Sequence, residues 1–399
     1  MERKCSCQIG PEVPTTTSLK HRGPTRLVLD VDCKQIIEGD EQHMVYGYDV
    51  MRTKKFNFPY DDDIGNVAKN CDKFKDLYNY ENFIVSKEEV EFPIAYSILT
   101  YKDVIQTEKL LRAIYRPHNI YCIHVDLSSS VSFHDSIKSI SECFPNVFIA
   151  SQLEDVIYAG YSRLQADLNC MSDLLRETSI QWKYVINLPS QVYPLKTNAE
   201  IVKILKLYNG FSSIETLDGY PMRYRFRTSF KVEGNVVSNT HEMKAPPLYN
   251  ITVGKGSAYG VFSRDFVNYS INDVKAKYLL QWLEDTYSHD EFFWATLAFN
   301  KHLNVPGVLP NGRLWIAVSS AWLGLQKCKG KFVRGVCVFG IGDLNRLVLK
   351  MALFANKFYF DYQPLALQCL EEWHFDKSFS ETPFLNNRYV ELLKAIKKH

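Results

Sequence analysis

The chain has 399 residues, a formal net charge of +2 at neutral pH and an aromatic content of 14%, with 24 Tyr, 24 Phe and 6 Trp. Basic and acidic residues are spread along the sequence, which argues against a nucleic-acid-binding basic block and against an acidic tail. The length allows one large domain plus a smaller segment, and the aromatic residues suit a well-filled core or stacking against the faces of sugars.

Residues 1–90 are polar and turn-rich, and we predict a leader and a stem or packing segment that is helical in part. Met1–Cys33 contains no apolar run of signal-peptide or membrane-anchor length. The Asp-Val-Asp sequence at 30–32 resembles a metal-holding motif of sugar-nucleotide transferases. It precedes any nucleotide-binding unit, so we interpret it as fortuitous. The three aspartates at 61–63 are interpreted as a solvated loop.

From Phe92 onward, buried-strand patterns alternate with helical patterns. The predicted strands are Phe92–Thr100, Tyr121–Asp126, Asn146–Ala150 and Tyr184–Leu188. The predicted helices are Val104–Tyr115, Phe133–Cys143, Arg163–Glu177 and Ala199–Leu207. This alternation predicts an α/β fold with a mostly parallel sheet. Ligands of such sheets bind beyond the carboxyl ends of the strands, where Asp126 is expected. A simple turn cap is an equally good interpretation of this aspartate.

The second half of the chain is less regular. Arg223–Val237 is basic, aromatic and strand-like, with turn material at 234–235. The Gly-rich sequence GKGSAY at 254–259 predicts a loop before another strand, but it lacks the ending of a P-loop. Phe332–Phe339 is predicted as a strand and Leu344–Phe354 as a helix. The last 40 residues are expected to finish in an amphipathic basic helix.

The stretch Tyr287–Phe299 is where we expect the chemistry. A helix from Ser288 would hold Glu291 at the edge of a pocket while Phe293, Trp294 and Leu297 enter the core. A carboxylate sheltered on one side suits a general base acting on a sugar hydroxyl. The alternative is a capping box, in which the side chains of Ser288 and Glu291 only satisfy backbone N–H groups at the start of the helix.

The ten cysteines show no paired zinc-binding spacing. Asn250 and Asn268 each begin an N-x-S/T sequon, which is compatible with the secretory pathway and predicts two glycosylation sites.

Between Phe92 and about Cys369 the chain resembles the branching β-1,6-N-acetylglucosaminyltransferases, the core 2 and I-branching family. The matching blocks follow the order of the family and include FPIAYSI, LLRAIYRPHNIYCIHVD, FPNVFIASQLEDVIYAGYSRLQADLNCM, WKYVINL, DTYSHDEFFWATL, VRGVCVFGIGDL and LFANKF. Together with the KAPP, GSAY and ALQCL pieces they extend over about 280 residues.

The resemblance implies a GT-A-like α/β glycosyltransferase fold over residues 91–399. It also implies an inverting, metal-independent transfer of GlcNAc from UDP-GlcNAc, with no cofactor. The implied acceptor is the 6-hydroxyl of a GalNAc or Gal residue on an O-glycan or glycoprotein, so that a β-1,6 branch is formed.

The resemblance also assigns roles to individual residues. Glu291 matches the catalytic base. The donor-binding positions that match are Leu99 at the uracil, Asp126 near the uridine and ribose, and Arg334 and Lys357 at the diphosphate. The acceptor-binding positions that match are Glu215, Tyr158 and Arg225, with Arg223 and Arg227 as close alternatives to the arginine.

The family's disulfides match Cys33–Cys369, Cys71–Cys143, Cys122–Cys170 and Cys328–Cys337, and Cys5 and Cys7 fall outside the pattern. Each bridge is expected to stabilise the fold by roughly 2–4 kcal/mol.

Four departures from the family pattern stand out. His289 occupies the place of a proline, Val192 occupies the place of an acid, and the stretch from Pro306 to Cys328 is shorter than in the vertebrate core 2 enzymes. Trp315 and Trp322 are candidate acceptor-contacting aromatics in that stretch. The fourth departure is the missing type II membrane anchor of a Golgi enzyme, for which we favour an alternative or incomplete amino terminus.

Three functions are therefore weighed. The leading hypothesis is an active branching transferase of the Golgi lumen, with a homodimer as one candidate assembly. The alternatives are a catalytically silent relative that binds glycans and a related xylosyltransferase. The joint presence of Glu291, Arg334 and Lys357 favours the active transferase, because a lectin needs none of them.

Overall fold

The computed structural model describes residues 23–217, 222–309 and 315–380, together with residues 387, 389–391 and 394. Cys5, Cys7 and most of the expected carboxyl-terminal basic helix lie outside these residues. In the described ranges, no helix is both long enough and apolar enough to cross a membrane.

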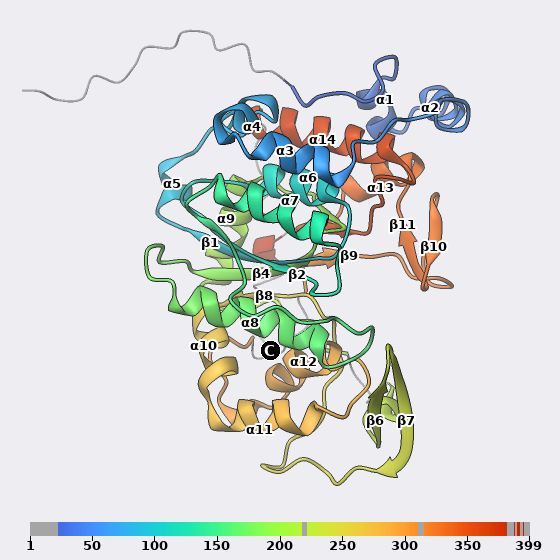
Figure 1. The fold of residues 1–399 in the computed structure, drawn as a ribbon. Helices are drawn as coiled ribbons and strands as arrows, with labels where there is room; N and C mark the ends of the chain where they lie inside the picture. Colours follow the sequence, from blue (N-terminus) through green and yellow to red (C-terminus); the bar gives the residue numbers. More distant parts are fainter. Residues whose placement is uncertain are drawn as a thin grey trace, which may run out of the picture.

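A mostly parallel five-stranded sheet forms the centre of the molecule (Figure 1). Its strands, in spatial order, are β3 (Val147–Ile149), β2 (Ile120–Val125), β1 (Ile94–Thr100), β4 (Tyr184–Pro189) and β8 (Val261–Ser263). Only β8 runs antiparallel to its neighbour. The α/β fold and the four strands predicted between residues 92 and 188 are therefore confirmed, with ends shifted by no more than about two residues.

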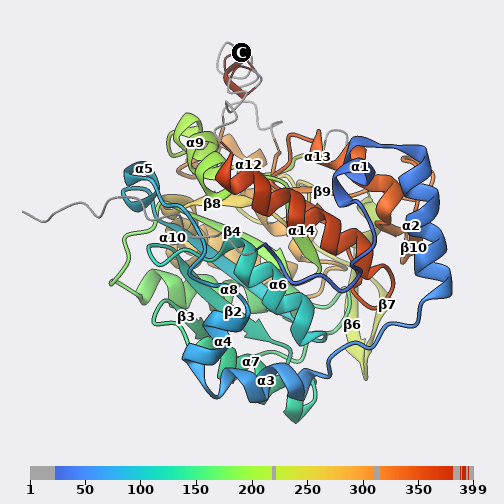
Figure 2. The same ribbon diagram turned by 90° about the horizontal axis from the view of Figure 1, so that it is seen from above.

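The central strand β1 is buried along its whole length because both faces of the sheet are covered. Ile94, Tyr96 and Ile98 belong to one hydrophobic core, and Ala95, which points the other way, belongs to a second core. The helices beside the first core are α6 (Val104–Ile114), α7 (Val131–Glu142) and α9 (Asn198–Tyr208). The helices of the second core are α8 (Ser162–Arg176), α10 (Arg264–Asn272), α11 (Val274–Leu283) and α12 (Asp290–Phe299). Figure 1 shows these two sets of helices as layers above and below the sheet, and Figure 2 looks down on the molecule from the side of the first set.

The amino-terminal segment begins beside the carboxyl-terminal helix and then packs against the first core. It forms five short helices, namely α1 (Cys33–Glu38), α2 (Glu41–Thr53), α3 (Asp61–Ala68), α4 (Cys71–Leu77) and α5 (Lys87–Val90). Helix α1 shares a third hydrophobic core with α14 (Pro364–Phe379), and the Cys33–Cys369 disulfide joins the two. The other three expected disulfides are also present: Cys71–Cys143, Cys122–Cys170 and Cys328–Cys337.

A second, three-stranded sheet packs beside the third core. Its strands are β5 (Val192–Pro194), β12 (Phe354–Asn356) and β9 (Val318–Ser319). Two separate hairpins complete the fold: β6 (Thr228–Glu233) with β7 (Val236–Met243), and β10 (Lys331–Val333) with β11 (Val336–Val338). The short helices that remain are η1 (Arg223–Arg225), η2 (Lys301–Leu303), η3 (Ile341–Asp343) and α13 (Leu344–Val348).

Three local predictions are wrong. The segment 332–339 is not one strand, because the chain reverses at Arg334 and Gly335, which have φ of 52° and 75°. The helix expected over 344–354 ends at Val348, and Phe354 instead begins β12. The aspartates at 61–63 form the first turn of α3, where they favour a helix amino terminus.

Candidate functional site

The carboxyl edge of the central sheet carries the first group of predicted site residues. Strand order changes direction between β1 and β4, and such a switch point is where open α/β sheets bind ligands. Leu99 lies at this edge and is aligned with Pro189 of β4, and its carbonyl oxygen accepts a 2.9 Å hydrogen bond from Ser190 N. Asp126 follows β2 directly. Its Oδ1 accepts hydrogen bonds from the backbone N and the hydroxyl of Ser128, at 2.9 and 2.7 Å. The turn cap is therefore formed, and a role toward a donor stays a prediction.

Arg334 and Lys357 come together beside this edge. Lys357 Nζ donates to the backbone oxygen of Val333 at 3.2 Å, next to the turn that presents Arg334. Burial, Arg334 and Lys102 lower the pKa of Lys357, in that order of effect. Lys102 Nζ lies 4.7 Å and Lys357 Nζ 5.3 Å from the centre of the same ring, Tyr359. Cations gathered in this way favour an anionic ligand, because they repel one another until it binds.

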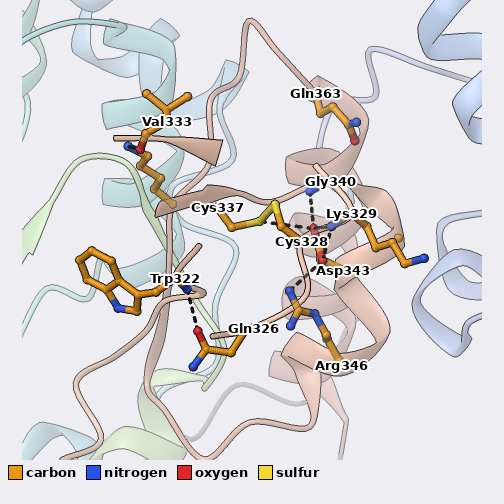
Figure 3. Close-up of a disulfide and its surroundings, with 12 residues drawn as sticks. Trp322, Gln326, Cys328, Lys329, Val333, Cys337, Gly340, Asp343, Arg346 and Gln363 are labelled. Atoms are coloured by element: carbon orange, nitrogen blue, oxygen red, sulfur yellow. Dashed lines mark hydrogen bonds and ion pairs between the residues drawn. A yellow bond between two sulfur atoms is a disulfide. The ribbon is translucent and has the colours of Figure 1, made fainter. Parts of the chain in front are cut away.

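The hairpin that presents Arg334 is anchored at its base. Figure 3 shows the Cys328–Cys337 disulfide next to Asp343. The buried Asp343 carboxylate accepts hydrogen bonds from the backbone N atoms of Lys329 and Gly340 and pairs with Arg346 at 2.8 Å. The turn at Arg334 therefore stands on a fixed base.

Glu291 lies in the first turn of α12. Phe293, Trp294 and Leu297 are buried as predicted, which fixes the helix against the core. The Glu291 side chain keeps 25% exposure, and its Oε2 contacts Arg225 at 2.6 Å and Lys255 at 3.2 Å. Two cations and the positive end of α12 therefore surround this carboxylate.

The capping-box alternative is wrong, and so is the predicted start of the helix at Ser288. The helix begins at Asp290 after His289, which makes no side-chain capping bond. Ser288 has φ of 57°, and its backbone N donates to Ala159 O at 2.9 Å. The side chain of Glu291 is therefore used by the two cations and not by the backbone of its own helix.

Burial sets the charge of the neighbours of Glu291. His289 is 2% exposed, its Nε2 donates to Glu284 O at 3.1 Å, and burial lowers its pKa to about 4. Burial raises the pKa of Asp290 to about 6, with Arg163 opposing the shift and Glu291 adding to it. The site therefore holds a neutral histidine next to an acid that ionises late.

The predicted acceptor residues lie around Glu291. Burial raises the pKa of Glu215, with Lys255 opposing and Glu291 adding to the shift. Arg225, on η1, contacts Glu291, and its guanidinium lies 5.2 Å from the ring centre of Tyr287. Among the three arginines considered, Arg225 is thus the one in contact with the predicted base.

Tyr158 connects the two groups of residues. Its side chain is 62% exposed, and the Arg334 guanidinium lies 4.7 Å from the centre of its ring. Tyr158 also interacts electrostatically with Tyr287, whose ring faces Arg225. Tyr158 therefore contacts Arg334 and lies within electrostatic range of Tyr287, which is next to Arg225 and Glu291.

The remaining candidate positions are placed as follows. Val192 is 1% exposed and pairs with Asn356 across the second sheet, so its side chain packs in the interior. Trp315 Nε1 donates to Tyr259 O at 2.9 Å, whereas Trp322 is 46% exposed beside the β10–β11 hairpin. The sequon residues Asn250 and Asn268 are both exposed.

The model of the "Core-2/I-Branching enzyme" family matches residues 94–348. This chain is a member of that family. It is therefore a glycosyltransferase.

Two human proteins are each 40% identical to this chain. One is named "Beta-1,3-galactosyl-O-glycosyl-glycoprotein beta-1,6-N-acetylglucosaminyltransferase 3", and the other has the same name without the number. The matches cover 86% of this chain and 82% and 84% of theirs. A bovine herpesvirus 4 protein with the unnumbered name is 38% identical over 363 residues, covering 86% of this chain and 82% of its own. The solved structure of mouse xyloside xylosyltransferase 1 overlaps 53% of this chain and 83% of its own at a TM-score of 0.29 and 12% identity, which supports no argument.

Two lysines in the site were not predicted. Lys102 lies just after a predicted strand, and Lys255 lies in the predicted Gly-rich loop. Neither belongs to a motif that identifies a charged site. Their positions depend on contacts with Tyr359 and Glu291, more than 30 residues away along the chain. The sequence alone holds no signal for them.

Proposed function

We propose that this branching-family chain transfers GlcNAc from UDP-GlcNAc to the 6-hydroxyl of a GalNAc or Gal residue on an O-glycan, with inversion and without a divalent metal. The observation that carries the proposal is the Glu291 carboxylate, which is held by Arg225 and Lys255. The cationic group at Arg334, which contacts Tyr158, supports it from the donor side. The printed names of the relatives support the same sugar and linkage.

In the proposed reaction, Glu291 takes the proton of the acceptor hydroxyl while the oxygen attacks the anomeric carbon. The bond from that carbon to the diphosphate breaks, and the leaving UDP takes the electron pair. One displacement from the opposite side turns an α-linked donor into a β-linked product.

Charge develops on the diphosphate as it leaves. Many enzymes offset such charge with a divalent ion. Here we assign that task to Arg334 and Lys357. An arginine fork and a lysine point charge can stabilise a phosphate group by charge-assisted hydrogen bonds. The closeness of Lys102 to Lys357 supports the same assignment.

On the acceptor side we assign Glu215, Tyr158 and Arg225, and on the nucleoside side Leu99 and Asp126. Because disulfides persist in oxidising compartments, the four bridges support residence in the secretory pathway, and we propose the Golgi lumen.

The test is a turnover assay with UDP-GlcNAc and the core 1 disaccharide, with EDTA and separately with manganese, followed by linkage analysis of the product. We expect a β-1,6-linked GlcNAc and equal rates in the two buffers. UDP-xylose as a competing donor tests the xylosyltransferase alternative. Glycan binding without turnover of either donor would support the silent relative, and a strict need for manganese would refute the metal-independent mechanism.

A further inference from the structure

Lys255 lies in the Gly-rich loop at 254–256, to which the sequence assigned no function. Its side chain is 9% exposed. Its Nζ contacts Glu291 Oε2 at 3.2 Å and donates to the backbone oxygen of Gly256 at 2.6 Å. A lysine this deeply buried needs a charged partner, because an unpaired ammonium in the interior is costly.

The backbone around Lys255 is fixed on both sides. Leu217 N donates to Lys255 O at 2.8 Å, and Gly256 N donates to Glu291 O at 2.8 Å. A Cβ atom at Gly256 would stand 1.9 Å from the backbone oxygen of Glu215, so the two chain segments touch there. The loop therefore joins the segment of Glu215 to the start of α12 and gives Lys255 little freedom to move.

Charges alternate across this junction. Glu215, Lys255, Glu291 and Arg225 interact in sequence, and Lys255 opposes the burial that raises the pKa of Glu215 and of Asp290. A neighbouring cation favours the ionised form of a carboxylate. Lys255 is thus the cation shared by Glu215, Asp290 and Glu291.

Both cations bind the same oxygen of the predicted base. Arg225 Nη1 and Lys255 Nζ contact Oε2 of Glu291. Because both cations hold Oε2, Oε1 is the atom that we assign to the acceptor proton. Removing one cation would loosen this orientation and weaken the preference for the charged form.

We propose that Lys255 is a positioning residue, which pairs with the Glu291 carboxylate and orients it for proton transfer from the acceptor hydroxyl. The inference rests on the proposed function, in which Glu291 is the general base. It distinguishes Lys255 from Arg334 and Lys357, which are assigned to the donor.

Other titratable groups also face this junction and contribute to its pH dependence. From the elements packed around Glu291 and Lys255 they are Glu215, Arg225, Tyr224, Tyr287 and Asp290, with Arg163 and Asp167 of α8 acting through Asp290. The test therefore compares variants at one position and leaves these groups unchanged.

The experiment measures kcat/KM against pH for the wild-type protein, Lys255→Met, Lys255→Gln and Lys255→Arg, with UDP-GlcNAc and the core 1 disaccharide. In the two neutral variants the acid limb of the profile is expected to move to higher pH by roughly one unit. At the low-pH end of that limb, kcat/KM should therefore fall by about tenfold. Lys255→Arg should restore the wild-type limb, and the Kd for UDP should stay unchanged in all three variants.

The matched control is Lys377→Met. Lys377 of α14 pairs with Glu200 of α9 at 2.7 Å and is also largely covered. Losing this pair is expected to lower the Tm without moving the acid limb, so the control separates positioning from general stability.

The outcomes separate the two levels of the proposal. An unmoved acid limb in the neutral variants, with the wild type active, overturns the role of Lys255. If Lys255→Met does not fold, Lys255→Gln decides the same question, because its side chain can still donate to Gly256 O. A shift of the acid limb that occurs only in Lys255→Arg also overturns the role. An inactive wild-type protein refutes the proposed function itself.

Discussion

Replacing Glu291 by Gln is the most direct test of the site, because the change removes the charge and keeps the size of the side chain. A general base contributes typically 10²–10⁴-fold to a rate, so kcat is expected to fall by about that factor. This loss corresponds to about 3 to 5 kcal/mol of transition-state stabilisation.

The fold should tolerate this substitution. Two attractions are weakened, to Arg225 and to Lys255, whose side chains are 18% and 9% exposed. Breaking a fully buried pair costs about 3–5 kcal/mol. Here the amide oxygen can still accept from Arg225, and the repulsion that Glu291 exerts on Glu215 and Asp290 disappears. We therefore expect a net loss of only about 1–2 kcal/mol in the free energy of unfolding.

The assay pairs turnover with calorimetric titration of UDP. The cations assigned to the diphosphate come from the β10–β11 turn and from Lys357, so the Kd for UDP should stay within about twofold of the wild-type value. The control is Glu200→Gln, which also weakens an ion pair, at 2.7 Å to Lys377, and should leave kcat unchanged. A kcat within threefold of the wild type, or equal losses of turnover and UDP affinity, would refute the general-base role.

Three other substitutions test separate parts of the structure. Arg334→Ala removes a cation from the proposed diphosphate site and should weaken UDP binding by about tenfold or more, since charge-assisted hydrogen bonds contribute about 1.5–3 kcal/mol; unchanged affinity by titration would exclude it from that site. His289 binds a proton more readily in the unfolded chain than in the fold, where burial lowers its pKa from 6.5 to about 4, so its contribution to stability falls as the pH drops through this window. Between pH 6.5 and 5 the free energy of unfolding, measured with urea, should fall by about 1.5 kcal/mol through His289. His289→Gln should lack this part of the pH dependence. The same pH dependence in the variant would contradict a lowered pKa at His289. Gly256→Ala should lower the free energy of unfolding by about 1–3 kcal/mol, because its Cβ would stand 1.9 Å from Glu215 O. In the control Gly23→Ala the new Cβ has no atom within 4 Å, so thermal unfolding should be unchanged.

The parts of the fold that follow from local patterns could be predicted. Strand β1 is mostly apolar and buried because it is covered on both faces, and the same holds for β2 and β4. Helix α6 has an apolar stripe whose residues, such as Leu110, Leu111 and Ile114, pack into the first core. The disulfide partners were expected through the family resemblance, since spacing alone leaves many connectivities open.

The errors occur where distant contacts decide the local structure. Phe354 belongs to a strand because Val318 and Pro194 pair with it from other parts of the chain. Asp61 accepts a hydrogen bond from Val104 N at 2.8 Å, which helps to order a stretch that looks like a loop by composition. At Arg334, a residue without the freedom of glycine adopts a positive φ that no propensity predicts.

The site divides in the same way. Glu291 could be proposed from its place before a buried apolar run, because the helix orients it by local geometry. Its partners Arg225 and Lys255 could not be paired with it, since they lie 66 and 36 residues away (291 − 225 and 291 − 255) and meet it only after folding. For the same reason the sequence could not distinguish between a cap and an ion-paired carboxylate.

The Cys328–Cys337 bridge gives the turn at Arg334 a further property. It closes a ring of ten residues around the hairpin, and Asp343 secures the foot of that ring. The disulfide therefore restrains the backbone turn from which Arg334 extends. The conformational entropy that a mobile loop would lose on binding a ligand is already lost there when the protein folds. The diphosphate that we propose to bind there would meet a turn that is ordered before it arrives.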